Sequence, residues 1–141
     1  MTNKQAGSGP RGWVVNRLPD GGVHSGVAPL PGGHPEEFVC IDVEAAGFNY
    51  KDALACDAHP GVARVLPLVP GIDVAGTLRS AFEGYAAGTP VVATGNGLGE
   101  SVQGGFATEV WAPPAAIIQR SESLSATAAM AMGTAGLTAI L

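Results

Sequence analysis

The sequence has few charged residues and no cluster of basic ones. Only 13% of its 141 residues are charged, and the formal net charge is −5. The seven Lys and Arg residues are scattered singly along the chain. Proteins that bind nucleic acid need grouped basic side chains to displace counterions from the phosphates. The distribution therefore predicts that the protein has no nucleic-acid partner.

Cysteine is equally scarce. Cys40 and Cys56 are the two cysteines of the chain, and three histidines accompany them. Two irregularly placed cysteines are too few for a disulfide framework or a zinc site. We therefore expect reduced thiols, small apolar roles for both residues, and an intracellular protein.

Long apolar runs are absent as well. No run approaches the ~18 residues that a membrane-spanning helix needs. The first ten residues are small and polar, without the apolar centre of a signal peptide. We therefore expect a soluble cytoplasmic protein with no membrane partner, in which residues 1–11 form a flexible tail.

Glycine and proline are abundant, and they divide the chain into short segments. Twenty-one Gly and eleven Pro punctuate the apolar runs, which is typical of turn-rich proteins. The length fits one domain with a single core. The fold class that we predict is mainly β with short helices. Strands are expected at residues 13–15, 38–45, 72–78, 91–94, 106–111 and 117–118, and the segment between the first two is expected to be a loop.

The segment 38–45 is the clearest of these strands. Its alternation places Val39, Ile41, Val43 and Ala45 on one face, which predicts a half-buried strand of an antiparallel sheet. In the strand predicted at 72–78, Gly76 indicates a close backbone approach or a bulge.

Two helices are expected. Residues 50–58 have helical composition with Asn49 as the N-cap, and the His-Pro-Gly sequence at 59–61 ends them. Residues 126–132 form a second helix, capped by Ser123 or Ser125, that loosens at 133–136 and resumes at 137–141. Because the sequence ends within this apolar helix, we expect that it is a truncated piece of a longer protein.

Residues 95–100 read GNGLGE and follow a predicted strand, as a nucleotide-binding loop does. No apolar helix follows them, and Gly104 and Gly105 interrupt the segment soon afterwards. A hairpin-type glycine loop is therefore favoured.

Five motifs resemble those of one family. They are NYKDAL at 49–54, PLVPGIDVAGT at 67–77, TG with GLGE at 94–100, GGFA at 104–107 and GTAGLTA at 133–139. In this order they resemble the medium-chain dehydrogenase/reductase superfamily, and more narrowly its zinc-free quinone-oxidoreductase-like branch, which includes the acrylyl-CoA (acryloyl-CoA) reductases.

The resemblance implies a two-part enzyme. Residues 12–122 would be a GroES-like, partly open β-barrel on the substrate side, and residues 123–141 a linker helix at the start of a Rossmann domain that this chain lacks. The implied function is NADPH-dependent reduction of an activated C=C bond (enoyl- or acrylyl-CoA-like) or of a quinone by hydride transfer. NADPH would be held mainly by the absent domain, so the chain alone would be inactive, and the full-length protein could form a homodimer. The alternative is a non-enzymatic, stand-alone barrel that acts as an interaction module.

The resemblance also assigns roles to residues. Tyr50 would line the nicotinamide pocket and contact substrate through its hydroxyl, or else pack on the barrel surface. Asn49 would hydrogen-bond in the cleft or cap the helix. Lys51 and Asp52 would form a proton-relay or carbonyl-binding pair, or an ordinary ion pair of the first helical turn. Thr134 would hold the nicotinamide carboxamide, or mark only a kink in the helix.

Further positions also bear on the site. Asp73 is expected to have a structural hydrogen-bonding role at the start of its strand. Ile72 stands where the zinc-dependent branch has a histidine, so we expect no zinc and no other metal. Asn96 and the pair 102–103 differ from the Trp and His-Trp that are common in this branch, which leaves the substrate class open.

Overall fold

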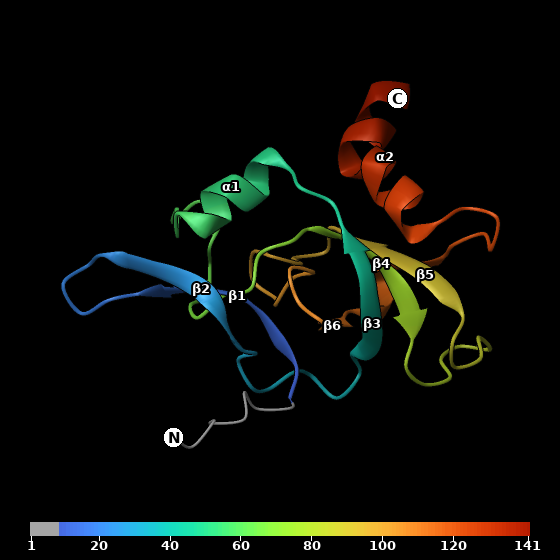
Figure 1. Ribbon diagram of the computed structural model, residues 1–141, viewed down its shortest axis with the longest axis horizontal. Helices are drawn as coiled ribbons and strands as arrows, with labels where there is room; N and C mark the ends of the chain where they lie inside the picture. Colours follow the sequence, from blue (N-terminus) through green and yellow to red (C-terminus); the bar gives the residue numbers. More distant parts are fainter. Residues whose placement is uncertain (1–8) are drawn as a thin grey trace, which may run out of the picture.

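The computed structural model describes residues 9–141, which fold into two open antiparallel sheets and two helices (Figure 1). The first sheet pairs two strands, and the second has the strand order β6-β3-β4-β5-β7. Neither sheet closes into a barrel, so the prediction of a mainly β, partly open architecture is confirmed. The strands are β1 (Arg11–Arg17), β2 (Val23–Pro29), β3 (Val39–Ala46), β4 (Asp73–Leu78), β5 (Pro90–Thr94), β6 (Glu109–Ala112) and β7 (Ile117–Gln119); the helices are α1 (Tyr50–Cys56), the short 3-10 helix η1 (Pro114–Ala116) and α2 (Ala126–Ile140).

The hairpin of β1 and β2 projects from the body of the molecule (Figure 1). The expectation of a loop after residue 15 was wrong for residues 23–29, which form β2 and pair with β1 over seven residues. Residues 18–22 and 30–38 lie outside any strand or helix, as expected. Val23 and Val27 of β2 are exposed, so the strand is held by backbone pairing and carries no buried apolar face. The flexible tail predicted for residues 1–11 lies largely outside the described residues, and Arg11 already belongs to β1.

Backbone hydrogen bonds join the hairpin to the rest of the fold. The Val15 and Leu68 backbones exchange N–H···O bonds of 2.8 and 2.9 Å, and the Trp13 N–H donates to the Phe106 carbonyl at 2.8 Å. The strand predicted from residue 106 therefore begins only at Glu109, because residues 104–108 bond to other segments.

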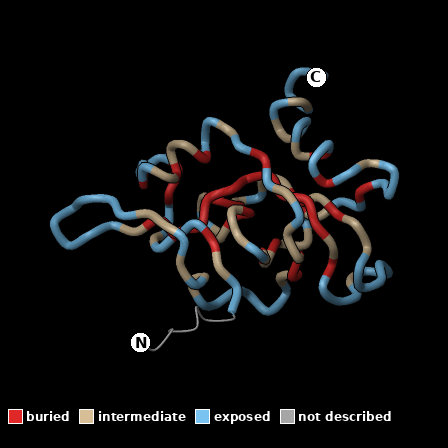
Figure 2. Tube along the Cα trace, viewed as in Figure 1, coloured by how far each residue is buried: buried red, intermediate tan, exposed pale blue. Residues whose placement is uncertain are grey.

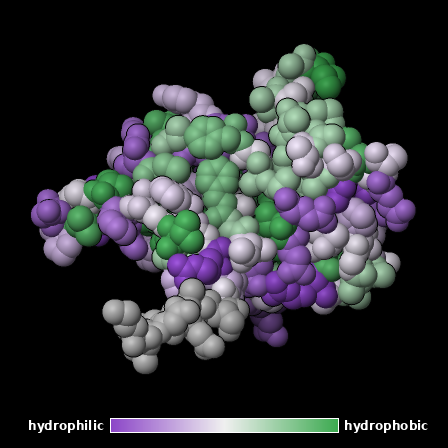
Figure 3. Space-filling view, in the orientation of Figure 1, coloured by the Kyte–Doolittle hydropathy of each residue, from purple (hydrophilic) through white to green (hydrophobic). Residues whose placement is uncertain are grey.

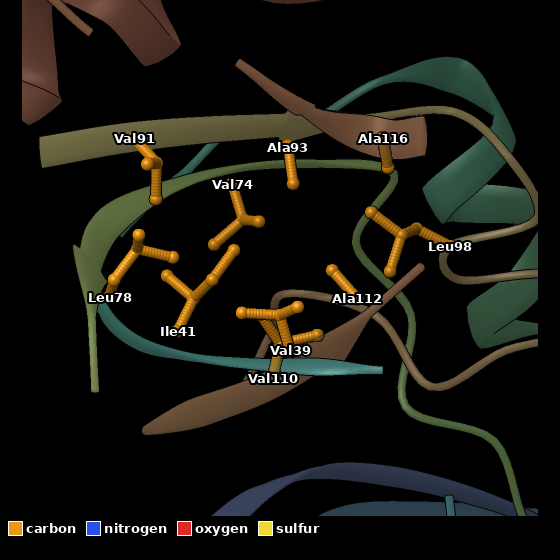
Figure 4. Close-up of a cluster of buried hydrophobic side chains, with 10 residues drawn as sticks. All are labelled: Val39, Ile41, Val74, Leu78, Val91, Ala93, Leu98, Val110, Ala112 and Ala116. Carbon is orange, nitrogen blue, oxygen red and sulfur yellow. The ribbon is translucent and has the colours of Figure 1, made fainter. Parts of the chain in front are cut away.

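The main core lies inside the five-stranded sheet, which curves around it. Ten buried apolar side chains gather there (Figure 4), including Ile41 from β3, Val74 from β4 and Val91 from β5. Val39 and Ile41 are buried as the alternation of β3 predicts. Cys40 on the opposite face is also buried, and this burial raises the pKa of its thiol to about 11.

Gly76 lies at the irregular point between β3 and β4. The register shifts between Val43 and Ala45, opposite Gly76 and Ala75. A Cβ atom at Gly76 would stand 2.0 Å from the carbonyl oxygen of Asp42. The close approach and the bulge that the glycine predicts are both present.

The two helices begin as predicted. α1 starts after Asn49 and ends at Cys56, two residues earlier than expected. α2 starts after Ser125, whose hydroxyl accepts from the Ala128 N–H at 3.1 Å. It breaks at Gly133, whose φ of 47° and ψ of −158° are not helical. Neither helix of the described residues is long and apolar enough to cross a membrane.

The glycine-rich segment after β5 forms consecutive turns. The Leu98 N–H donates to the Gly95 carbonyl, and the Ser101 N–H to the Gly97 carbonyl, both at 3.0 Å. No helix follows before β6. The segment thus forms turns and lacks the helix that follows a nucleotide-binding loop, as expected. The hairpin expected there was wrong, because β5 and β6 are not neighbours in the sheet.

Candidate functional site

The carboxylate of Asp73 joins three separated parts of the chain. It begins β4, is 1% exposed, and lies opposite Thr94 of β5 in the sheet register. Its Oδ2 accepts from the Asn49 side-chain amide at 2.9 Å and from the Thr134 N–H at 2.7 Å. Its Oδ1 accepts from the hydroxyls of Thr94 and Thr134. The structural hydrogen-bonding role expected for Asp73 is therefore present, and we call these four residues the Asp73 network.

The network favours the ionised form of Asp73. Burial by itself would raise the pKa of this carboxyl. The hydrogen bonds donated by Thr134, Thr94 and Asn49 outweigh burial and hold its pKa below the usual range, because donors stabilise the charged form. Among residues 9–141, the network thus holds a buried negative charge without a cationic partner.

Asp52 connects the motif at residues 49–54 with the motif at residues 67–77. It lies in the first turn of α1 and is fully buried. Its Oδ1 accepts from the N–H groups of Gly71 and Ile72, both at 3.0 Å, and its Oδ2 accepts from the Asn49 N–H at 2.7 Å. Both oxygens are occupied by backbone donors, so the geometry favours a positioning role over contact with a substrate.

Lys51 and Asp52 do not form the pair that the sequence suggests. Consecutive helical residues point in different directions, and Lys51 instead forms an ion pair with Glu100, 49 residues later. The expected ion pair between Lys51 and Asp52 is therefore not formed. Lys51 remains half-exposed beside α1.

Tyr50 is the most accessible of the predicted site residues. It begins α1, and 80% of its surface is exposed. Phe48, two residues earlier, is 71% exposed, and its ring stacks on Phe106 with centroids 5.9 Å apart. Together with the exposed apolar residues of α2, including Met132 and Leu137, they leave apolar surface uncovered on the side where both helices stand (Figures 1 and 3).

The structure brings some predicted residues together and separates others. Asn49 and Thr134 meet at Asp73, while Tyr50 and Lys51 lie on the exposed surface of α1. None of them lines the cavity of about 360 Å³, which lies between the segment 30–38, the segment 101–104 and β6. Thr94 is a member of the network that the sequence did not indicate. Thr94 meets Asp73 only through the register of β4 and β5, and no local sequence pattern predicts this contact.

The metal-ligating side chains are also dispersed. Among residues 9–141, no three His, Cys, Asp or Glu side chains are grouped as a metal site requires. Ile72, at the position occupied by histidine in zinc-dependent relatives, is buried and carries no ligand atom. The absence of zinc stays a prediction.

Comparisons with known proteins agree with the fold. The family of the alcohol dehydrogenase GroES-like domain matches residues 35–122. A probable acrylyl-CoA reductase of Escherichia coli K12 and a putative quinone oxidoreductase of Bacillus subtilis are each 41% identical over 108 residues, which are 76% of this chain and 33% of each relative. The chain thus matches about a third of the length of these curated relatives.

Solved structures show the same relationship. An oxidoreductase of Salmonella enterica in complex with NADP has a TM-score of 0.83 at 34% identity, over 92% of this chain and 40% of that one. A Bacillus subtilis protein with NAD bound has a TM-score of 0.78 at 35% identity, over the same shares of the two chains. The chain therefore belongs to the alcohol dehydrogenase GroES-like domain family of the medium-chain dehydrogenase/reductase superfamily.

Proposed function

We propose that this chain is the substrate-side part of an NADPH-dependent reductase that acts on an activated C=C bond or on a quinone. The observation that carries the proposal is the 41% identity to an acrylyl-CoA reductase and to a quinone oxidoreductase across most of the chain. In the proposed protein, residues 12–122 form the substrate-side domain. Residues 123–141 lead into a nucleotide-binding domain of the Rossmann type.

The proposed cofactor is NADPH, held mainly by that second domain. The neighbouring structures with bound NADP, NADPH and NAD support a nicotinamide cofactor. When bound, the reduced nicotinamide supplies a hydride. Thr134 of this chain fits a carboxamide group. The hydrogen of its hydroxyl is committed to Asp73, so its oxygen is left to accept from an amide N–H.

The residues of α1 would act on the substrate side. Tyr50 presents an exposed phenol that can orient a carbonyl or quinone oxygen through its hydroxyl. Asn49 directly precedes Tyr50, and its side-chain amide is held by the Asp73 carboxylate. Asp52 fixes the start of the helix on the Gly71–Ile72 backbone, and Lys51, in its ion pair with Glu100, lies at the edge of the same surface.

We propose that the reaction proceeds without a metal ion. The partner of the protein is a small-molecule substrate, either an enoyl-CoA or a quinone. We further propose that the full-length protein works in the cytoplasm and can form a homodimer.

The test uses the full-length protein and follows NADPH oxidation with acrylyl-CoA and, separately, with a benzoquinone. We expect turnover with one of the two substrates. Replacement of Tyr50 by Phe is expected to lower kcat/KM by about a hundredfold, the low end of what a positioned acid or hydrogen-bond donor contributes.

Tyr85→Phe is the matched control, because Tyr85 lies in the connection between β4 and β5. Equal kinetics of the Tyr50 and Tyr85 variants would show that the Tyr50 hydroxyl has no role. A full-length protein that oxidises NADPH with neither substrate would contradict the proposed reaction.

A further inference from the structure

We propose that Asp73 is a positioning residue: it caps the second half of α2 from the sheet, and so fixes both the direction of that half and the place of Thr134 beside Asn49. This inference goes beyond the proposed function, because it does not depend on the substrate or the cofactor. It rests on the break in α2, on the hydrogen bonds at the break, and on the space around the carboxylate.

The two halves of α2 are held in different ways. In the first half, Ala126 and Ala129 are buried against Ala75 of β4. Beyond the break at Gly133, Leu137 is 55% exposed and Ile140 is 81% exposed. Figure 2 shows the C-terminal end of the chain as exposed. Within residues 9–141, packing therefore fixes the first half only, and the direction of the second half depends on the polar contacts at the break.

Asp73 makes those contacts. The first N–H groups of a helix lack acceptors within it, and a side-chain oxygen usually satisfies one of them from the N-cap position. Here the Thr134 N–H donates to Asp73 Oδ2 at 2.7 Å, and its hydroxyl donates to Oδ1 at 2.6 Å. The capping carboxylate thus comes from a residue 61 positions earlier in the chain. Its charge strengthens both bonds.

The backbone around the carboxylate is built to approach it. A Cβ atom at Gly133 would lie 2.8 Å from Asp73 Oδ2, and the φ of 47° at that residue disfavours any side chain. A Cβ atom at Gly47 would lie 3.2 Å from the Asp73 Cβ and 3.4 Å from the Met130 carbonyl oxygen. Glycine at both positions lets the two segments close on Asp73.

Two substitutions of Asp73 distinguish the effect of its hydrogen-bonding atoms from the effect of its charge. In Asp73→Asn, the amide oxygen can take the place of Oδ2 and keep the bonds from the Thr134 N–H and from Asn49. The new NH2 then faces the hydroxyls of Thr94 and Thr134, which can rotate to accept. In Asp73→Ala, all four donors lose their acceptor.

The experiment measures amide hydrogen exchange by NMR on the full 141-residue chain. We expect the Thr134 amide to be protected in the parent protein. Asp73→Ala should make its exchange at least about tenfold faster, in keeping with the loss of a helix cap. Asp73→Asn should restore most of the protection. Asp20→Ala is the matched control, because Asp20 accepts from the Gly22 N–H in an exposed turn, and it should leave Thr134 unchanged.

A second variant keeps the test decisive if Asp73→Ala does not fold. Gly133→Ala alters no polar atom, yet its Cβ would collide with Asp73 Oδ2. We expect it to expose the Thr134 amide while the amides of β4 and β5 stay protected. Free exchange of Thr134 in the parent protein would overturn the proposal. Retained protection of the Thr134 amide in Asp73→Ala would also overturn it. If Asp73→Ala is unfolded, retained protection of the Thr134 amide in Gly133→Ala would overturn it instead. Enzyme activity is not measured, so this outcome is separate from the fate of the proposed reaction.

Discussion

Replacement of Asp52 by Ala tests how the motif at residues 49–54 is joined to the motif at residues 67–77. The substitution removes the acceptor of three backbone N–H groups. Those of Gly71 and Ile72 are bonded in the interior, and that of Asn49 lies at the partly buried start of α1. Water can reach the third donor more easily than the first two. The cost therefore falls mainly on the buried pair.

The magnitude follows from these contacts. A buried donor left without a partner costs about 1–3 kcal/mol, and the lost contact at the helix start adds about 1 kcal/mol. After partial relaxation, we expect Asp52→Ala to lower the free energy of unfolding by about 3–5 kcal/mol. This is a large fraction of the ~5–15 kcal/mol that stabilises an ordinary domain.

Asp52→Asn should cost less, about 1–3 kcal/mol. Its amide oxygen can still accept from Gly71 and Ile72, while its NH2 group faces the Asn49 N–H. Asp57→Ala is the control, because Asp57 is an exposed acidic residue at the other end of α1. It should change stability by less than about 0.5 kcal/mol.

The assay is urea denaturation followed by tryptophan fluorescence and circular dichroism. The order expected for the free energy of unfolding is parent, then Asp52→Asn, then Asp52→Ala. A loss of less than about 1 kcal/mol for Asp52→Ala would refute the reasoning, because the buried N–H groups would then have found other partners.

Three further predictions concern stability. Gly76→Ala should lower the free energy of unfolding by about 1–3 kcal/mol in urea denaturation, because its Cβ would meet the Asp42 carbonyl oxygen. An unchanged denaturation midpoint would contradict this close approach. Lys51→Ala should cost less than about 1 kcal/mol, since its ion pair with Glu100 is partly exposed, and a larger loss would show that the pair supports the fold. The folded-state pKa of Asp73 is lowered, so its stabilisation is present above the ordinary aspartate pKa and is lost as the pH falls through the folded-state value. The difference in unfolding free energy between the parent and Asp73→Asn should therefore shrink in acid, and a constant difference across the pH series would count against an ionised Asp73.

Local patterns were enough to predict several elements. The alternation from Val39 predicted β3, Asn49 predicted the start of α1, and the glycines near residue 133 predicted the break in α2. Each of these signals acts over a few residues. The strand β2 was missed because its side chains carry no buried face, and only its pairing with β1 makes it a strand.

The contacts of the site could be predicted less well, because they join distant residues. Asp73 meets Thr94 through the register of β4 and β5, and it meets Thr134 only because α2 packs on β4. The partner of Lys51, Glu100, lies in a loop 49 residues away. Spacing along the sequence indicates none of these contacts, whereas the fold determines them all.

The most direct test of the proposed function follows the hydride itself. Full-length protein would be supplied with NADPH in which deuterium replaces both hydrogens on the reactive carbon of the nicotinamide, together with acrylyl-CoA. Mass spectrometry and NMR of the product would then locate the label. The account predicts deuterium bonded to the former alkene carbon remote from the carbonyl, and a proton from solvent on the adjacent carbon. A saturated product without deuterium, or no reduction of either acrylyl-CoA or a quinone, would contradict it.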